Sequence, residues 1–268
     1  MSRGGSGGHI RVKTSRGRTA QSTRWLERQL NDPYVKKAKA EGYRSRAAYK
    51  LIELDERFAI IRGSKRVVDL GLAPGGWTQV VRRQAPKAAI VGIDLLPVDP
   101  IEGATILQMD FMDDAAPAML VDALGGPPDL ILSDMAANTV GHPQTDALRT
   151  MALVETGLAF AIDVLEKGGC YVAKVFAGGA DSALVAEMKR NFNSVKHAKP
   201  PASRKGSSEW YVVAQGFKGR AAESRSYSSS RPGPRPAGKA RPTTRRCRGA
   251  SYSPASSQPS PENNNGSA

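Results

Sequence analysis

Residues 66–77 read Arg-Val-Val-Asp-Leu-Gly-Leu-Ala-Pro-Gly-Gly-Trp, an apolar β-branched run followed by a glycine-rich turn. This pattern predicts a strand that ends where the backbone opens around a ligand. Gly71, Gly75 and Gly76 leave no side chain between the main chain and a ligand, and Pro74 stiffens the turn. Open α/β sheets bind nucleotides at such turns, at the carboxyl ends of their strands.

The spacing of these glycines argues against two common nucleotide motifs. It differs from the G-x-G-x-x-G of NAD-binding units, and it lacks the lysine of the phosphate loop. We therefore interpret the turn as part of a site for S-adenosylmethionine (SAM). Asp94 ends the next apolar run, about 20 residues past the glycines, where Rossmann-like folds place the acid that binds a ribose.

Apolar runs and helical patterns alternate between residues 25 and 218, which predicts a doubly wound α/β fold with a mostly parallel sheet and helices on both faces. The predicted strands are seven: 66–70, 89–94, 105–108, 129–133, 169–176, 194–197 and 210–217. One helix is predicted over 45–58. A second covers 146–167, with a buried stripe of Leu148, Met151, Leu158, Ile162 and Leu165. A third begins at the N-cap Asp181 and buries Leu184, Val185, Met188 and Phe192.

Charge is distributed unevenly along the 268 residues, whose formal net charge is +14. Residues 1–24 and 219–268 are basic and rich in Gly, Ser, Pro or Arg, so we predict two flexible tails around one domain at 25–218. Basic tails of this kind favour nucleic acid as the partner. The alternative is that they only add solubility, which we favour for the last nine residues.

The composition also argues against other classes of protein. No stretch approaches the roughly 18 apolar residues of a membrane span, and the N-terminus has no signal-peptide core, so we expect a cytoplasmic protein without membrane contact. We also expect a monomer. An organelle transit peptide is the minor alternative, which the glycines oppose. Cys170 and Cys247 form no metal-ligand pair and no disulfide framework. We expect no metal.

Two ionisable residues stand out in apolar surroundings. Lys174 lies within Tyr-Val-Ala-Lys-Val-Phe, and Asp134 ends the apolar strand at 129–133. A buried ammonium is costly unless it is paired or deprotonated, so we interpret Lys174 as functional rather than as a lysine that extends to the surface. A basic run ahead of the first strand, Lys36 to Arg46, predicts an RNA contact; a solvated helix face is the alternative.

Six motifs, in order, resemble the FtsJ-type ribosomal RNA ribose 2′-O-methyltransferases over about residues 22–218. They are Arg44-Ser-Arg-Ala-Ala-Tyr-Lys-Leu51, Asp69-Leu-Gly-Leu-Ala-Pro-Gly-Gly-Trp77, Asp94-Leu-Leu-Pro97, Ser133-Asp-Met135, Val172-Ala-Lys-Val-Phe176 and Ser203-Arg204 with Glu209-Trp-Tyr-Val-Val-Ala214. The resemblance implies a Rossmann-like SAM-dependent methyltransferase fold. It also implies methylation of a ribose in rRNA of the large ribosomal subunit, a uridine of 23S rRNA.

The resemblance further implies a catalytic tetrad, Lys50, Asp134, Lys174 and Glu209. Lys174 is the expected base for the ribose hydroxyl. Its pKa, about 10.4 in a free lysine, must fall for the neutral amine to form near pH 7. Burial and Lys50 favour that fall, whereas Asp134 and Glu209 oppose it, so the four groups are expected to titrate together.

The remaining expected contacts are to the cofactor and to RNA. For SAM the predicted residues are Gly71, Gly75, Gly76, Trp77, Asp94, Asp110 and Asp134; by itself, Asp110 would be interpreted as a loop cap. For RNA they are Lys36, Lys37, Arg44, Arg46, Arg204 and Lys205.

Two classes of function compete on these observations. The first is an RNA 2′-O-methyltransferase, with rRNA as the expected substrate and tRNA or a messenger cap as alternatives. The second is a noncatalytic RNA-binding assembly factor with the same fold. The complete tetrad favours the enzyme, because a binding protein has no need for a lysine inside a sheet.

Overall fold

The computed structural model describes residues 11–12, 17, 19–137, 142–176, 182–204 and 206–220. These residues belong to one compact unit, Met1–Ser224. The predicted N-cap Asp181 and the predicted RNA contact Lys205 lie outside the described residues.

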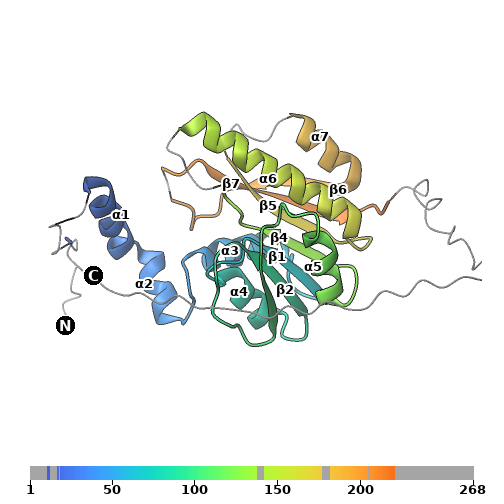
Figure 1. The fold of residues 1–268 in the computed structure, drawn as a ribbon, viewed down its shortest axis with the longest axis horizontal. Helices are drawn as coiled ribbons and strands as arrows, with labels where there is room; N and C mark the ends of the chain where they lie inside the picture. The colour runs from blue at the N-terminus through green and yellow to red at the C-terminus, as the bar shows by residue number, and fades with distance from the viewer. Residues whose placement is uncertain are drawn as a thin grey trace, which may run out of the picture. The chain divides into compact units, whose positions relative to one another are not determined.

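A seven-stranded sheet forms the centre of this unit, in the order β3-β2-β1-β4-β5-β7-β6 (Figure 1). Strands β1 to β5 pair in parallel, and β7 runs antiparallel between β5 and β6. The predicted α/β class with a mostly parallel sheet is confirmed. The strands are β1 Arg66–Leu70, β2 Ala89–Asp94, β3 Ala104–Gln108, β4 Leu130–Ser133, β5 Cys170–Phe176, β6 Phe192–Ala198 and β7 Glu209–Phe217.

Helices cover both faces of the sheet. The helices are α1 Ala20–Asn31, α2 Pro33–Ala40, α3 Ala47–Phe58, α4 Gly76–Gln84, α5 Ala116–Leu124, α6 Pro143–Val164 and α7 Ser182–Asn191. Successive strand residues point to opposite faces: Val68 packs in the core beneath α5, α6 and α7, whereas Val67 packs against α3 and α4. Figure 1 shows α6 and α7 together on one side of the sheet and α3 and α4 on the other.

Three details differ from the sequence prediction. Leu148 is 73% exposed rather than buried, because it lies in the part of α6 that precedes the helix's first buried apolar residues. Phe192 opens β6 instead of continuing the preceding helix, since α7 passes into the strand with no intervening loop. The predicted tail boundary after residue 24 falls inside α1, which begins at the N-cap Thr19.

The topology places functional groups at one edge of the sheet. Chain order reverses between β1 and β4, and the carboxyl ends of parallel strands meet there, as at the ligand sites of other open α/β sheets. Antiparallel β7 begins at the same edge, because Glu209 pairs with Phe176 at the end of β5.

Two classes of site find no support in the described part of the chain. None of its helices is both long and apolar enough to cross a bilayer. It also holds no group of three His, Cys, Asp or Glu side chains arranged around a common metal position.

Candidate active site

Four ionisable residues from distant parts of the chain meet at this edge of the sheet. Lys50 projects from α3, Asp134 follows β4, Lys174 lies in β5 and Glu209 begins β7. Both lysines are buried despite their charge: Lys50 is 8% exposed and Lys174 is 5% exposed. The structure therefore brings together all four members of the predicted tetrad.

The four side chains form two ion pairs. Lys174 Nζ lies 3.2 Å from Asp134 Oδ1 and also donates a 2.5 Å hydrogen bond to the Asp134 backbone oxygen. Lys50 Nζ lies 3.2 Å from Glu209 Oε2. Each buried ammonium thus has a carboxylate partner, whose attraction offsets the free energy lost when the ammonium leaves water.

Tyr211 links the two pairs, and the sequence reasoning did not single it out. Its hydroxyl donates a 2.7 Å hydrogen bond to Asp134 Oδ1, and Lys50 Nζ lies 5.7 Å from the centre of its ring. Tyr211 pairs with Lys174 across the β5–β7 ladder. The period-two pattern of a strand, which puts Glu209 and Tyr211 on one face, is the sequence signal that could have found it.

The electrostatics of the site follow from this packing. Burial alone would raise the pKa of Asp134, but Lys174, Lys50 and the Tyr211 hydroxyl together hold it below its usual value. Burial and the adjacent Asp134 carboxylate raise the pKa of Tyr211 well above 10. Asp134 is therefore a carboxylate near neutral pH, and Tyr211 is a neutral hydrogen-bond donor.

A cavity of about 250 Å³ opens beside Asp134 at the ends of β1, β2 and β4. We call it the strand-end cavity. Its lining combines acids with apolar side chains: Gly71, Ala73, Ile93, Asp94, Leu95, Leu96, Met109, Asp110, Phe111, Asp134, Met135, Ala136 and Leu153. Four of the residues predicted to bind SAM, Gly71, Asp94, Asp110 and Asp134, are among them.

Gly71 is the glycine on which this cavity depends. Its φ is +77°, and a Cβ there would lie 2.8 Å from Met135 Cγ. Gly75, Gly76 and Trp77 do not line the cavity. Gly76 and Trp77 pack at the start of α3: the Trp77 indole donates to the Ala47 carbonyl, and a Cβ on Gly76 would lie 2.5 Å from Ser45 Oγ. Gly75 instead lies against the side chains of Ile101 and Arg44.

The two acids of the strand-end cavity already shape its loops. Asp94 accepts hydrogen bonds of 2.9 Å from the backbone N–H groups of Ala73 and Leu96. Asp110 Oδ1 accepts one of 2.9 Å from the Met112 N–H, the loop cap that its sequence context suggested. A carboxylate has further lone pairs, so both acids can still accept from a ligand.

A second cavity, of about 560 Å³, borders the Lys50–Glu209 pair of the tetrad. Its lining is Arg28, Gln29, Arg46, Lys50, Arg204, Gly206, Ser207 and Glu209. Asp134 thus contacts one cavity, while its neighbours Lys50 and Glu209 contact the other. The ion-paired cluster therefore borders both cavities.

The residues predicted to bind RNA fall into three groups. Lys36 is exposed, and Lys37 lies over the Tyr49 ring at 4.5 Å. Arg46 and Arg204 reach the second cavity. The guanidinium of Arg44 instead donates to the backbone oxygens of Pro74, Asp99 and Pro100, so it ties the glycine-rich turn to the loop after β2.

The sequence and the fold are similar to those of known proteins. The FtsJ-like methyltransferase family matches residues 43–217. The chain belongs to this family. A protein of Rhizorhabdus wittichii named ribosomal RNA large subunit methyltransferase E is 76% identical over 82% of this chain and 96% of its own length. The protein of that name from Novosphingobium aromaticivorans is 71% identical over 82% of this chain and 99% of its own.

A solved structure agrees with the assignment. A structure from Plasmodium falciparum, described as a ribosomal RNA methyltransferase, superposes with a TM-score of 0.60 at 33% identity, over 66% of this chain and all of its own. The chain is therefore a methyltransferase.

Proposed function

We propose that this methyltransferase transfers the methyl group of SAM to a ribose 2′-hydroxyl in rRNA of the large ribosomal subunit, a uridine of 23S rRNA, in the cytoplasm. The names of the relatives support the rRNA substrate. The observation that carries the chemistry is the buried Lys174–Asp134 pair, whose carboxylate lines the strand-end cavity while the neighbouring Lys50–Glu209 pair lines the second cavity.

The strand-end cavity suits SAM in its chemistry. Asp94 offers carboxylate oxygens to the ribose hydroxyls and Asp110 to the adenine end, and Ile93, Leu96 and Phe111 offer apolar surface to the adenine. Its volume is slightly below the roughly 300–1,000 Å³ of ligand pockets. When bound, SAM supplies a methyl group on a positively charged sulfonium, which needs no further activation. Asp134 would stand beside the methionine end, where its negative charge complements the sulfonium.

Lys174 would act as the base. Its neutral amine would accept the proton of the 2′-hydroxyl at Nζ, so that the ribose oxygen could take the methyl group that bound SAM would supply, with S-adenosylhomocysteine as the leaving group. Asp134, 3.2 Å from that nitrogen, stabilises the ammonium that results. Alignment of the two reactants between the cavities supplies much of the remaining rate.

Lys50 and Glu209 would position the ribose. They face the second cavity, from which the RNA must approach, and each holds the other in place through their ion pair. Arg46, Arg204, Lys36 and Lys37 would contact the RNA backbone. Arg44 would act through the turn it holds, because its guanidinium donors are directed at backbone carbonyls.

The test is methyl transfer from labelled SAM to three separate substrates: large ribosomal subunits, free rRNA and tRNA. We expect incorporation into large-subunit rRNA, at a 2′-oxygen when the modified nucleotide is mapped. Modification of tRNA alone would replace the substrate, and labelling of a base would remove the role of the tetrad. Binding of RNA with no incorporation into any substrate would indicate the noncatalytic assembly factor.

A further inference from the structure

A large cavity of about 870 Å³ lies between α1 and the segment 201–204, outside the tetrad and the strand-end cavity. Its lining is Arg24, Glu27, Arg28, Asn31, Asp32, Pro33, Tyr34, Arg46, Pro201, Ser203 and Arg204. Because Arg28, Arg46 and Arg204 also line the cavity of Lys50 and Glu209, the two adjoin. We call this continuous opening the arginine groove.

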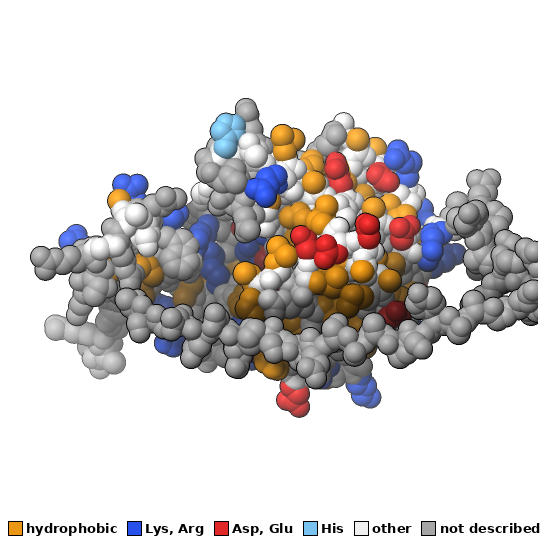
Figure 2. Space-filling view, in the orientation of Figure 1, with side chains coloured by type: hydrophobic (Ala, Val, Ile, Leu, Met, Phe, Trp, Pro, Cys, Tyr) orange, Lys and Arg blue, Asp and Glu red, His pale blue; other side chains and the backbone are white. Residues whose placement is uncertain are grey.

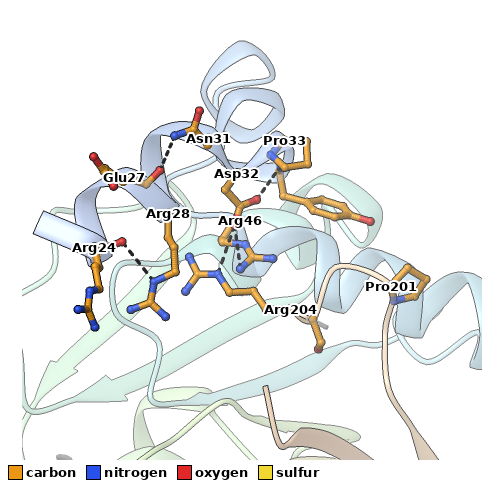
Figure 3. Close-up of a pocket in the computed structure, with 11 residues that line it drawn as sticks. Arg24, Glu27, Arg28, Asn31, Asp32, Pro33, Arg46, Pro201 and Arg204 are labelled. Carbon is orange, nitrogen blue, oxygen red and sulfur yellow. Dashed lines mark hydrogen bonds and ion pairs between the residues drawn. The ribbon is translucent and has the colours of Figure 1, made fainter. Parts of the chain in front are cut away.

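Positive charge gathers in the groove beyond what its own acids neutralise. Asp32, 7% exposed, pairs with both Arg46 at 3.0 Å and Arg204 at 3.4 Å. Figure 3 shows these two guanidinium groups converging on Asp32, with Arg28 beside them. One buried carboxylate, Asp32, thus pairs with both Arg46 and Arg204. Among the lining residues, Glu27 is the acid left to balance the charges of Arg24 and Arg28.

Arg24 and Arg28 line the groove from one face of α1. Arg24 and Arg28 are four residues apart, so they project together from the helix, and both are exposed. Figure 3 shows both side chains extending from α1 on the side of the groove. Arg28 Nε donates to the Arg24 backbone oxygen at 3.3 Å, which leaves its terminal nitrogens available to a ligand. Figure 2 shows Lys and Arg side chains between the α1–α2 segment and the sheet, and Asp and Glu on the viewed face over α5 and α6.

Several donors in the groove have no hydrogen-bond partner among the described residues. They are Nε of Arg46, a terminal nitrogen of Arg204 and the hydroxyl of Ser203, all buried. Unpaired buried donors are costly, and four arginines in one opening repel one another. A polyanion in the groove would relieve this repulsion.

We propose that Arg24 and Arg28 bind backbone phosphates of the substrate strand, so that α1 and the segment 201–204 hold the RNA on either side as it leads to Lys50 and Glu209. The proposal rests on the proposed function for the identity of the RNA. It assigns a substrate-binding role to α1, which precedes the residues 43–217 that the family model matches. Arginine suits this role because its planar fork donates two hydrogen bonds to one phosphate.

The experiment compares the full-length protein with Arg24→Ala/Arg28→Ala and with a matched control, Arg57→Ala/Arg62→Ala. The control pair lies at and beyond the carboxyl end of α3, away from the groove, and removes the same charge. The probe is a fluorescent single-stranded RNA oligonucleotide, titrated at several salt concentrations. Far-ultraviolet circular dichroism and thermal unfolding check that all three proteins are folded.

The slope of the logarithm of the binding constant against the logarithm of the salt concentration tests whether Arg24 and Arg28 bind phosphates. Removing two phosphate-binding side chains should reduce its magnitude by about 1.4, since each phosphate neutralised on a single strand contributes about 0.7. The control should keep the wild-type slope. With large-subunit rRNA as substrate, the groove variant should raise KM for RNA by about tenfold and leave kcat and KM for SAM unchanged, as expected when binding weakens equally in the ground and transition states.

Each other outcome counts against the proposal. An unchanged slope in the groove variant overturns it, and so does an equal change in the control. Loss of activity only on ribosomal particles, with an unchanged slope on RNA, would mean that α1 contacts a ribosomal protein instead. If the wild type methylates no RNA, the proposed function fails, while the comparison of slopes still decides whether the groove binds RNA.

Discussion

Lys174 is buried and forms an ion pair with Asp134, whose carboxylate lines the strand-end cavity. If its role is to accept a proton, charge alone does not suffice. Lys174→Arg preserves a cation next to Asp134, but a guanidinium cannot lose its proton near neutral pH. We expect Lys174→Arg and Lys174→Ala to lower kcat by about 10²–10⁴, the range for a lost general base.

Binding of SAM separates this effect from a damaged fold. Calorimetry should give both variants a dissociation constant for SAM within about threefold of the wild type, which corresponds to less than about 1 kcal/mol. Normal methyl incorporation by a folded Lys174→Ala protein would remove Lys174 as the base. Activity in the arginine variant alone would show that a positive charge, rather than proton transfer, is what the site requires.

Asp69 is a second buried ionisable residue, placed in β1 at 1% exposure. Its Oδ2 accepts a 2.6 Å hydrogen bond from Thr78, while Oδ1 has no hydrogen-bond partner among the described residues. Burial, with the charges of Asp134 and Asp94, raises its pKa from 3.8 to about 7. The folded state therefore favours the protonated carboxyl over a pH range in which the unfolded chain is ionised.

Stability should depend on pH accordingly. The contribution of Asp69 to the free energy of unfolding is complete below about pH 4 and is lost as the pH rises through about 7. Relative to Asp69→Asn, the wild type should lose stability over this range, on the order of 1.4 kcal/mol per unit of pKa difference. Urea unfolding at a series of pH values measures it. Asp114→Asn, at an exposed position, is the control, and a pH-independent difference for Asp69→Asn would contradict the expectation.

At the scale of elements, the strand-end cavity depends on how closely β1 and β4 bring their following turns together. Gly71 has φ of +77°, and a Cβ there would lie 2.8 Å from Met135 Cγ and 3.0 Å from Met135 backbone atoms. Gly63, with φ of +91°, has nothing within 4 Å. A side chain at either position would have to adopt a positive φ, but only at Gly71 would it also meet neighbouring atoms.

Alanine substitutions separate strain from crowding. Gly63→Ala should cost about 1–2 kcal/mol of unfolding free energy, the cost of a left-handed L-residue. Gly71→Ala should cost about 2–4 kcal/mol, because overpacking adds to that strain, and should also weaken SAM binding by about tenfold or more. Thermal unfolding and calorimetry measure the two effects; equal losses of stability with unchanged SAM affinity would show that the turn at Met135 yields easily.

The sequence predicted an element well where its hydrophobic pattern fits only one kind of secondary structure. Arg66–Leu70 and Ala89–Asp94 are strands over the residues expected, because short β-branched runs bounded by glycine or acid have few alternatives. Leu148 and Phe192 were misplaced because periodicity cannot show where the sheet stops covering a helix, or that β6 begins with no loop. The polar α1, crossed by the predicted boundary at residue 24, has too few apolar residues to signal a helix.

The four ionisable residues were found in sequence, but their pairing was not. Motifs identified Lys50 and Glu209 individually, whereas their ion pair needs β7 to run antiparallel beside β5, so that Glu209 begins at the edge where Phe176 ends. Tyr211 and Asp32 were missed for a related reason. Each looks ordinary along the chain, one within an apolar strand and one as a helix N-cap before Pro33, and each gains its role from contacts across the fold.

For the whole molecule, the uneven charge distribution predicts how RNA binding divides between the tail and the domain. Residues 219–268 carry nine Lys and Arg against two Glu, while the arginine groove supplies directed contacts near the tetrad. Lys and Arg outside a directed site contribute affinity through counterion release, which does not depend on where along the RNA they bind. The tail should therefore raise the concentration of enzyme on RNA without affecting alignment at the site.

Replacing those nine Lys and Arg with Gln in the full-length chain tests this division, because length is kept while charge is removed. KM for RNA should rise and its salt dependence should flatten, by about 0.7 in the slope for each phosphate that the tail no longer neutralises. The rate kcat should not change, because nonspecific charge affects how much RNA is bound and not how the ribose is placed beside Lys174. Steady-state kinetics on large-subunit rRNA at two or more salt concentrations decide the matter: a fall in kcat would mean that the tail helps position the substrate, and an unchanged slope would mean that it serves solubility alone.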